Sequence, residues 1–183
     1  MKGIIFNEFL EFIETSMTYT MVDKVLLACD LESGGAYTAI GTYNSKELFC
    51  LVDALGKQIN KPSSQILTEY GEYLFNIFVT KYPHFFQKKT STFNFLCKIE
   101  NHMHVEVKKF YQDVDLPHFQ TESPIPSQLI LIYRSSRPLA DFAEGLIRGC
   151  IKFHGETIDI YRQDYPLNKG SKSKFILTKK DLQ

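Results

Sequence analysis

The chain has 183 residues, enough for one domain with a sizeable core, and its 21 Lys plus Arg balance its 21 Asp plus Glu. Without a basic excess, the composition argues against a protein that binds nucleic acid. No apolar run approaches the roughly 20 residues of a transmembrane helix, and the N-terminus is too polar for a signal peptide, which predicts a soluble cytoplasmic protein with no membrane partner. Fifteen Phe and ten Tyr are typical of an aromatic core, or of a core that also lines a large apolar ligand.

The first two-thirds of the chain has the pattern of helices, because apolar residues recur every three or four positions. The predicted helices cover residues 3–18, residue 22 to near Gly34-Gly35, 46–57, 62–82 and 91–111. Gly56 is expected to close the third helix, Pro62-Ser63 to begin the fourth and Pro83 to end it.

The last third changes character, because β-rich or alternating segments occur at residues 128–133, 157–161 and around 175–177. Residues 168–171 have the composition of a hairpin loop, and Pro138 is expected at the first position of a helix that includes Cys150. We therefore expect an α+β fold with a single domain over 1–183. Its helical part covers about 1–112, and an antiparallel sheet with packed helices covers about 113–183. The segment 117–126 is the only internal seam that we expect.

The four cysteines, Cys29, Cys50, Cys97 and Cys150, are far apart and form no C-x-x-C pair. This spacing argues against a zinc knuckle and against a disulfide scaffold. It favours reduced, mostly buried thiols, as expected in the cytosol.

Five histidines are present, and none forms an H-E-x-x-H pair on one helix face. His102 and His104 lie two positions apart on the helix predicted over 91–111, so they project about 200° from each other and cannot ligate one metal together. His104 lies on the less polar side, which also carries Cys97, Val107 and Tyr111. A buried ligand would therefore be His104 rather than His102, although this pattern also fits an ordinary core or surface histidine.

A second polar motif, Tyr133-Arg134-Ser135-Ser136-Arg137, continues the strand predicted at 128–133. In an extended chain Tyr133, Ser135 and Arg137 face one side, so a phenol, a hydroxyl and a guanidinium form a row about 13 Å long. Such a row can engage two carboxylates of one ligand, because the guanidinium fork matches a carboxylate. The same pattern also fits the polar outer face of an edge strand.

Together these residues resemble the heme-nitric oxide/oxygen binding (H-NOX) family, in its bacterial stand-alone form, over nearly the whole chain. The likeness rests on residues 1–6 (MKGIIF), Tyr70-Gly71, 104–111 (HVEVKKFY), Leu116-Pro117, Tyr133-x-Ser135-x-Arg137 and 142–146 (FAEGL). It implies a heme b between the two parts of the fold, with His104 as the proximal iron ligand. Tyr133, Ser135 and Arg137 would hold the propionates, and Pro117 would press on the porphyrin. The implied pocket lining, which also fits plain core packing, is Ile5, Phe9, Leu74, Phe78, Phe142 and Leu146.

One departure concerns the gas side of the implied pocket. Oxygen-binding members carry a distal tyrosine whose hydroxyl donates to the gas, and the matching position here is Phe142. Oxygen gains negative charge on ferrous iron and NO gains much less, so a pocket without a donor penalises oxygen more than NO. The resemblance thus implies a nitric oxide sensor that excludes oxygen and also binds CO.

A second departure concerns zinc. Some relatives carry a Cys-rich zinc site in the C-terminal part, and none is expected here because no cysteine follows residue 150.

The resemblance also implies how such a protein signals. NO would weaken the bond between iron and His104, and release of His104 would free its helix and alter the surface that a partner reads. We expect a partner in trans, either a histidine kinase or a cyclic-di-GMP enzyme, because the chain has no room for an output domain.

Two alternatives to a gas sensor remain at this point. One is a heme enzyme, peroxidase-like or NO-consuming, although the pocket positions lack a distal His/Arg acid–base pair. The other is a heme-free interaction module.

Overall fold

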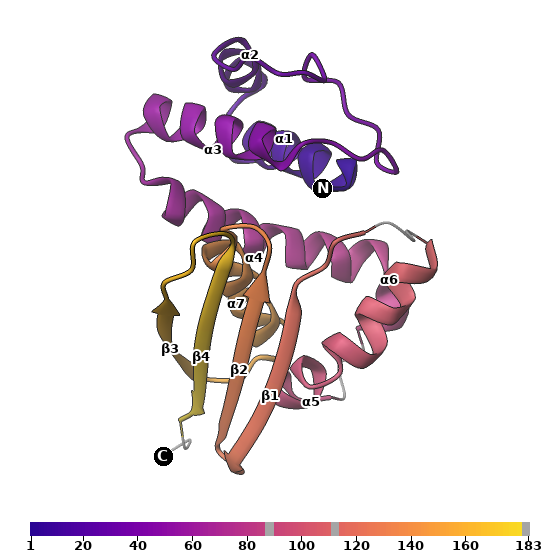
Figure 1. The fold of residues 1–183 in the computed structure, drawn as a ribbon, viewed down its shortest axis with the longest axis vertical. Helices are drawn as coiled ribbons and strands as arrows, with labels where there is room; N and C mark the ends of the chain where they lie inside the picture. The colour runs from indigo at the N-terminus through magenta and orange to yellow at the C-terminus, as the bar shows by residue number, and fades with distance from the viewer. Residues whose placement is uncertain (87–89, 111–113, 181–183) are drawn as a thin grey trace.

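Helices fill the first part of the chain and a four-stranded antiparallel sheet fills the last part, where one further helix comes between the second and third strands in sequence (Figure 1). A computed structural model describes residues 1–86, 90–110 and 114–180. The helical elements are α1 (Gly3–Ser16), α2 (Tyr19–Leu27), α3 (Ser45–Ile59), α4 (Ser63–Lys81), the 3-10 turn η1 (Pro83–Phe85), α5 (Thr92–Leu96), the π-helical segment η2 (Ile99–Met103), α6 (His104–Phe110) and α7 (Ala140–His154). The strands are β1 (His118–Ile125), β2 (Gln128–Ser135), β3 (Ile158–Tyr165) and β4 (Ser171–Lys179), in the order β1-β2-β4-β3. This architecture confirms the expected α+β class; the expected boundary near residue 112 lies outside the described residues.

Short polar side chains explain where several helices begin. The side chains of Thr18, Asn44 and Ser91 each accept a hydrogen bond from a backbone N–H in the first turn of α2, α3 and α5. The start of α1 has no side-chain cap. There the N–H of Gly3 donates to the carbonyl oxygen of Gly41 at 2.9 Å, so the loop before α3 holds the beginning of α1 in place.

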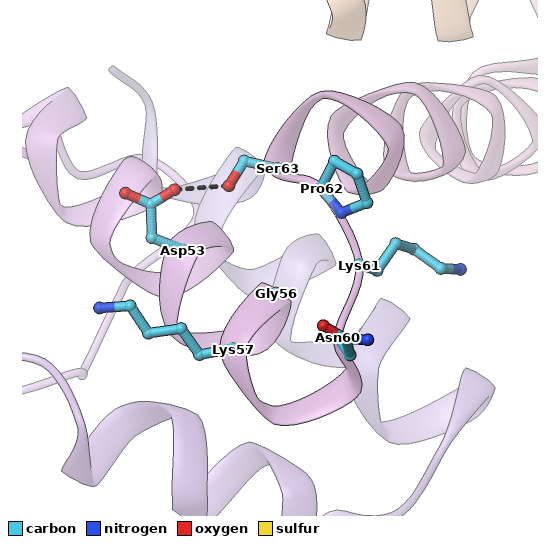
Figure 2. A pocket seen from close by; sticks show the side chains of 7 residues that line it. All are labelled: Asp53, Gly56, Lys57, Asn60, Lys61, Pro62 and Ser63. Atoms are coloured by element: carbon cyan, nitrogen blue, oxygen red, sulfur yellow. Dashed lines mark hydrogen bonds between the residues drawn. The ribbon is translucent and has the colours of Figure 1, made fainter.

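The turn between α3 and α4 corrects the expectation that Gly56 closes a helix. α3 runs past Gly56 and ends where Asn60 adopts the left-handed conformation, with φ of 53°. Gly56 is needed for a close approach instead, because a Cβ there would lie 2.7 Å from the carbonyl oxygen of Lys61. Ser63 donates to Asp53 across the turn at 2.6 Å (Figure 2). The surface pocket beside this turn includes no predicted site residue; it is lined by Asp53, Gly56, Lys57, Asn60, Lys61, Pro62 and Ser63.

Two other predicted helices are wrong in extent. The helix expected to reach Gly34 is α2, which ends at Leu27, and Gly34 lies in a later turn. The helix expected over 91–111 is divided into α5, η2 and α6, and Cys97, expected on its less polar side, is exposed. A π-helical segment changes the angle between successive residues, so positions extrapolated from one straight helix do not hold across it. Tyr111, expected beside His104, lies outside the described residues.

The segment 117–126, expected to be a seam, contains the edge strand β1. β1 pairs antiparallel with β2, and Phe119 lies opposite Tyr133 in this register. Pro124 cannot donate to the ladder, and the register shifts in the interval after Glu122 that contains it. Proline is tolerated in a sheet at such bulges and on edge strands, which explains why a proline-bearing polar segment still forms a strand.

Two hydrophobic clusters make up the core, and α4 contributes to both. The first cluster joins α1, α2, α3 and α4, and it includes the fully buried Phe9 and Leu74. The second joins α4, α5, α7 and the sheet, and α7 lies behind the sheet in Figure 1. Phe78 of α4 and Leu146 of α7 pack against both clusters, so the boundary between the clusters runs along these two helices. Among the described residues, no helix is long and apolar enough to cross a lipid bilayer.

Two facing glycines bring α4 and α7 into close contact. A Cβ at Gly71 would lie 2.3 Å from the carbonyl oxygen of Phe142, and one at Gly145 would lie 2.0 Å from that of Thr68. Side chains at either position would force the two helix backbones apart. α7 itself begins at Ala140, later than the expected start at Pro138.

We expect Gly145→Ala to lower the free energy of unfolding by about 1–3 kcal/mol, because the added methyl group overpacks this helix contact. Urea denaturation followed by circular dichroism measures the change. Asn76→Ala on the exposed surface of α4 is the control, and we expect it to change stability by less than about 0.5 kcal/mol. Equal effects of the two substitutions would contradict the importance of the glycine contact.

Candidate functional site

His104 is the first residue of α6 and lies largely buried, with 13% of its side chain exposed, whereas His102 is exposed. The Nδ1–H of His104 donates to Glu100 Oε2 at 3.2 Å, since a carboxylate can only accept. Its ring also contacts Phe119, with 5.9 Å between ring centroids. The inference that His104 is the less exposed of the two histidines is therefore confirmed.

Glu100 in η2 joins His104 to the beginning of β1. Its carboxylate accepts from the N–H of Phe119 at 3.0 Å and from Nδ1 of His118 at 3.1 Å, in addition to His104. Burial raises the pKa of Glu100, but these hydrogen bonds and the charge interaction with His104 outweigh it, so its pKa lies below the ordinary value. Glu100 is thus an anion at neutral pH that holds His104 in one orientation.

The same contacts prepare His104 to bind a metal through Nε2. Burial lowers the pKa of His104, and the nearby Glu100 opposes this only in part, so the imidazole is neutral at pH 7. With its proton on Nδ1, a neutral ring carries its lone pair on Nε2. A histidine that donates its other N–H to a carboxylate is the usual arrangement of a metal ligand in proteins.

Glu100 was not among the sequence-predicted site residues, although a carboxylate four positions before a helical histidine is a detectable signal.

We expect Glu100→Gln to weaken heme binding by about 10-fold, because the charge that orients His104 is lost. Heme transfer to an acceptor protein measures this. Glu106→Gln is the matched control, since Glu106 lies in the first turn of α6 but pairs with Lys109 near the surface. If Glu106→Gln weakened heme binding as much as Glu100→Gln, the effect would come from the loss of any nearby negative charge rather than from the contact with His104.

Tyr133 and Ser135 lie on one buried face of β2, as the alternation of the strand predicted. Arg137 follows the end of β2 at a bend, so the extended row does not continue to it. The N–H of Arg137 instead donates to Ser135 Oγ at 3.1 Å, and Ser171 Oγ donates to the carbonyl oxygen of Arg137 at 2.7 Å. These bonds hold the three residues of the motif together, although by a turn rather than by an extended strand.

The guanidinium of Arg137 bonds to the segment that carries Pro117. Its Nη1 donates to the carbonyl oxygen of Asp115 at 2.9 Å, and its Nη2 lies 3.1 Å from Asp115 Oδ2. Ser136 Oγ also donates to Asp115 Oδ2 at 2.5 Å. Arg137 is therefore positioned as a carboxylate ligand, with 19% of its side chain exposed. Sequence reasoning missed Asp115, because no spacing rule links the two residues.

Phe119 connects His104 to the Tyr133 motif. Its ring lies 5.9 Å from His104 and 5.4 Å from Tyr133, measured between centroids. The two polar motifs, separated by nearly 30 positions in sequence, thus lie near the same end of the β1–β2 pair. Burial raises the pKa of the Tyr133 hydroxyl, while hydrogen bonds with Ser135 and Ser171 oppose the rise. Tyr133 is therefore a neutral donor at pH 7.

All six predicted pocket-lining residues belong to the first core cluster or pack against it, and two of them also contact the second cluster. Phe9 and Leu74 are fully buried in the first cluster, and the partly buried Ile5 and Phe142 pack against it. Phe78 and Leu146 are partly buried and pack against both clusters. Pro117 is also partly buried, in the loop before β1. These five partly buried residues leave apolar surface that a flat apolar ligand can cover.

Tyr70 contributes a phenol to this region that the sequence analysis used only as part of a motif. Its ring lies 5.3 Å from Phe142 and 5.0 Å from Phe9, between centroids. Its hydroxyl donates to the carbonyl oxygen of Ile5 at 2.5 Å. The proton of this phenol is therefore committed to the backbone of α1, although the residue is completely buried among the predicted pocket residues.

The donor set and the apolar lining fit a heme. His104 offers an imidazole nitrogen to iron, Arg137 offers a guanidinium to propionate groups, and apolar side chains from α1, α4 and α7 offer surface for a porphyrin. No cluster of three or more His, Cys, Asp or Glu suited to another metal site occurs among the residues that the structure describes.

Comparisons with known proteins agree with this chemistry. A family model described as haem-NO-binding matches residues 2–162. The chain is similar to the Fe(II) unliganded H-NOX protein from K. algicida, with 35% identity, a TM-score of 0.91, and 100% of this chain and 99% of that chain covered. It is also similar to the H-NOX from Shewanella woodyi in the Fe(II)CO ligation state, with 32% identity, a TM-score of 0.83, and 99% and 95% covered. The S. oneidensis H-NOX protein in the Fe(II)NO ligation state shares the fold at 24% identity, with a TM-score of 0.88 and 99% and 100% covered. A search of curated proteins finds no match.

Proposed function

The chain belongs to the haem-NO-binding (H-NOX) family of heme-based gas-sensing domains, and from this premise we propose that it is a nitric oxide sensor that excludes oxygen. The proposed cofactor is heme b, since the sequence has no C-x-x-C-H motif for covalent attachment. When bound, its ferrous iron supplies the coordination position for a diatomic gas. The observation that carries the proposal is the largely buried imidazole of His104, held in one orientation by its hydrogen bond to Glu100.

Each part of the proposed site has a separate task. His104 binds iron through Nε2, and Glu100 keeps its ring oriented. Arg137, with Tyr133 and Ser135, binds the propionates, so Arg137 exchanges part of its contact with Asp115 for the ligand carboxylates. Pro117 presses on the porphyrin from the loop before β1. Apolar packing around the ligand comes from Ile5, Phe9, Leu74, Phe78, Phe142 and Leu146.

Exclusion of oxygen follows from the proposed absence of a free donor on the gas side. Phe142 has no polar atom in its side chain, and the nearby Tyr70 donates its proton to Ile5 rather than to a ligand. Oxygen on ferrous iron needs such a donor more than NO does, because it carries more negative charge. CO, which also needs little hydrogen bonding, is expected to bind as well.

Signalling is proposed to occur by release of His104 when NO binds. α6 begins at His104 and is connected through the short π-helical segment η2, so a displaced His104 moves the beginning of a helix rather than a side chain alone. Val105, beside His104, is an exposed apolar residue on this helix. The proposed partner is a separate histidine kinase or cyclic-di-GMP enzyme that reads the altered surface.

The ferrous absorption spectrum, recorded under argon, in air and with NO, tests the proposal. We expect a Soret band that shifts with NO to the position typical of heme that has lost its protein ligand, and that is not converted to a stable new species by air. A stable change in air would contradict oxygen exclusion. A spectrum in NO that retains the histidine ligand would contradict release of His104, and an uncoloured protein that takes up no heme would contradict the whole proposal.

A further inference from the structure

Two cysteines that are distant in sequence lie side by side in the helical part of the molecule. Cys29 follows the end of α2, Cys50 lies in the second turn of α3, and their Sγ atoms are 2.6 Å apart. A disulfide bond is about 2.05 Å long, so the two sulfurs need to move by only about half an ångström to form one. Both are free thiols and both are partly exposed. Contact and access together are what disulfide formation requires.

The segment between these cysteines is already held by other contacts. Glu47, which is 6% exposed, accepts hydrogen bonds from Ser33 at 2.5 Å and from Tyr37 at 2.8 Å. These bonds tie the loop after α2 to α3 on the same side as the cysteine pair. A bond between Cys29 and Cys50 would therefore lock an arrangement that exists without it, and its reduction would leave the fold intact.

We propose that Cys29 and Cys50 form a reversible disulfide, which makes this pair a redox modification site separate from the heme site. A low-molecular-weight disulfide such as oxidised glutathione is the oxidant. Its S–S bond breaks, an S–S bond forms between Cys29 and Cys50, and the two thiol protons leave on two glutathione thiols. A dithiol reductant reverses the exchange. Disulfides in cytosolic proteins are usually of this transient, redox-sensing kind.

The surroundings of the pair set how readily it reacts. Burial, followed by the hydrogen bond and charge interaction with Cys50, raises the pKa of Cys29 to about 12. Cys29 is therefore protonated at pH 7, which slows its attack on a disulfide. Once Cys50 carries a glutathione group, Cys29 is the thiol in contact with it and completes the exchange. Neither step involves the iron or its ligands.

The other two cysteines serve as internal references. Cys97 is exposed and Cys150 is completely buried in the second core cluster. Burial and the charge of Glu156 raise the pKa of Cys150 far above its ordinary value. Cys97 is thus expected to take a single glutathione, and Cys150 is expected to stay unmodified in the folded protein.

The test uses the full heme-loaded chain, incubated in glutathione buffers of increasing oxidised fraction and then alkylated. Mass spectrometry of peptides is expected to show a Cys29–Cys50 linkage, with loss of two hydrogen atoms from the chain, that a dithiol reverses. Cys29→Ser and Cys50→Ser should each abolish the linkage, and Cys97→Ser should retain it. An unchanged Soret band in all three variants shows that they remain folded.

Two results would overturn the proposal. One is the absence of a Cys29–Cys50 linkage in buffers that fully glutathionylate Cys97. The other is formation of a linkage that includes Cys97 or Cys150, because it would arise from unfolded or associated chains. A thermal unfolding midpoint that is several degrees higher in the oxidised protein is the expected accompanying change, since the linkage closes the loop from 29 to 50. The same midpoint in both states would contradict the expected constraint that the linkage places on the unfolded chain.

Discussion

His104→Ala is expected to leave the protein without stably bound heme, with the Soret band lost on gel filtration and partly restored by added imidazole. The substitution removes the largely buried ring that Glu100 orients with its Nε2 lone pair available. Loss of an orienting partner alone typically costs about 10- to 100-fold in metal affinity, so loss of the ligand itself should exceed that range. The heme content per chain, measured after gel filtration, gives the size of the effect.

His102→Ala is the matched control, because it removes an exposed imidazole only two residues away. We expect the spectrum of this variant to be unchanged. His118→Ala is a second control, since His118 shares the Glu100 carboxylate but is largely exposed, with 69% of its side chain accessible. If His102→Ala or His118→Ala lost heme while His104→Ala retained it, the assigned iron ligand would be wrong.

Phe142→Tyr should give the ferrous protein a measurable affinity for oxygen. The added hydroxyl lies on the residue that we propose to face the gas, and the phenol of Tyr70 beside it is already committed to Ile5. A hydrogen bond to a charged acceptor contributes about 1.5–3 kcal/mol, which corresponds to a gain of roughly 10- to 150-fold in oxygen affinity. Titration of the ferrous protein with oxygen, with NO and CO binding measured in parallel, separates a donor effect from a general change in the pocket.

Phe153→Tyr provides the control for Phe142→Tyr, because it adds the same hydroxyl to the same helix, on a side chain that packs against Phe75 in the second cluster. We expect no change in oxygen affinity from it. If Phe142→Tyr also leaves oxygen affinity unchanged while heme binds normally, the side chain at position 142 does not face the gas.

The sequence was informative where apolar periodicity was long and unbroken. α1, α3 and α4 lie close to their predicted positions, as do β2 and the helix that contains Cys150. β1 was missed because Pro124 and its polar neighbours contradict strand composition, and pairing with β2 overrides that local preference. The break between α5 and α6 was missed because helical periodicity alone does not register a π-helical segment.

The candidate site was predictable only in part, because some of its contacts depend on how distant segments pack together. His104, Tyr133, Ser135 and Arg137 were identified by motif, and the structure brings them to the same region through Phe119. Phe119 and Asp115 depend on strand pairing and on the course of a loop, which spacing along the chain does not encode. The turn at Arg137 replaced the expected extended row, because hydrogen bonds to Ser135 and from Ser171 bend the chain there.

The three hydrogen bonds accepted by Glu100 have a mechanical consequence for the proposed switch. Because one carboxylate holds both His104 and the backbone of Phe119, displacement of the histidine from iron must either break a bond to Glu100 or pull on the first residues of β1. A pull on β1 couples α6 to the edge of the sheet. Amide hydrogen exchange would then increase at 118–120 as well as in α6 when NO is added, and a partner could bind the sheet edge and the helix as one composite surface.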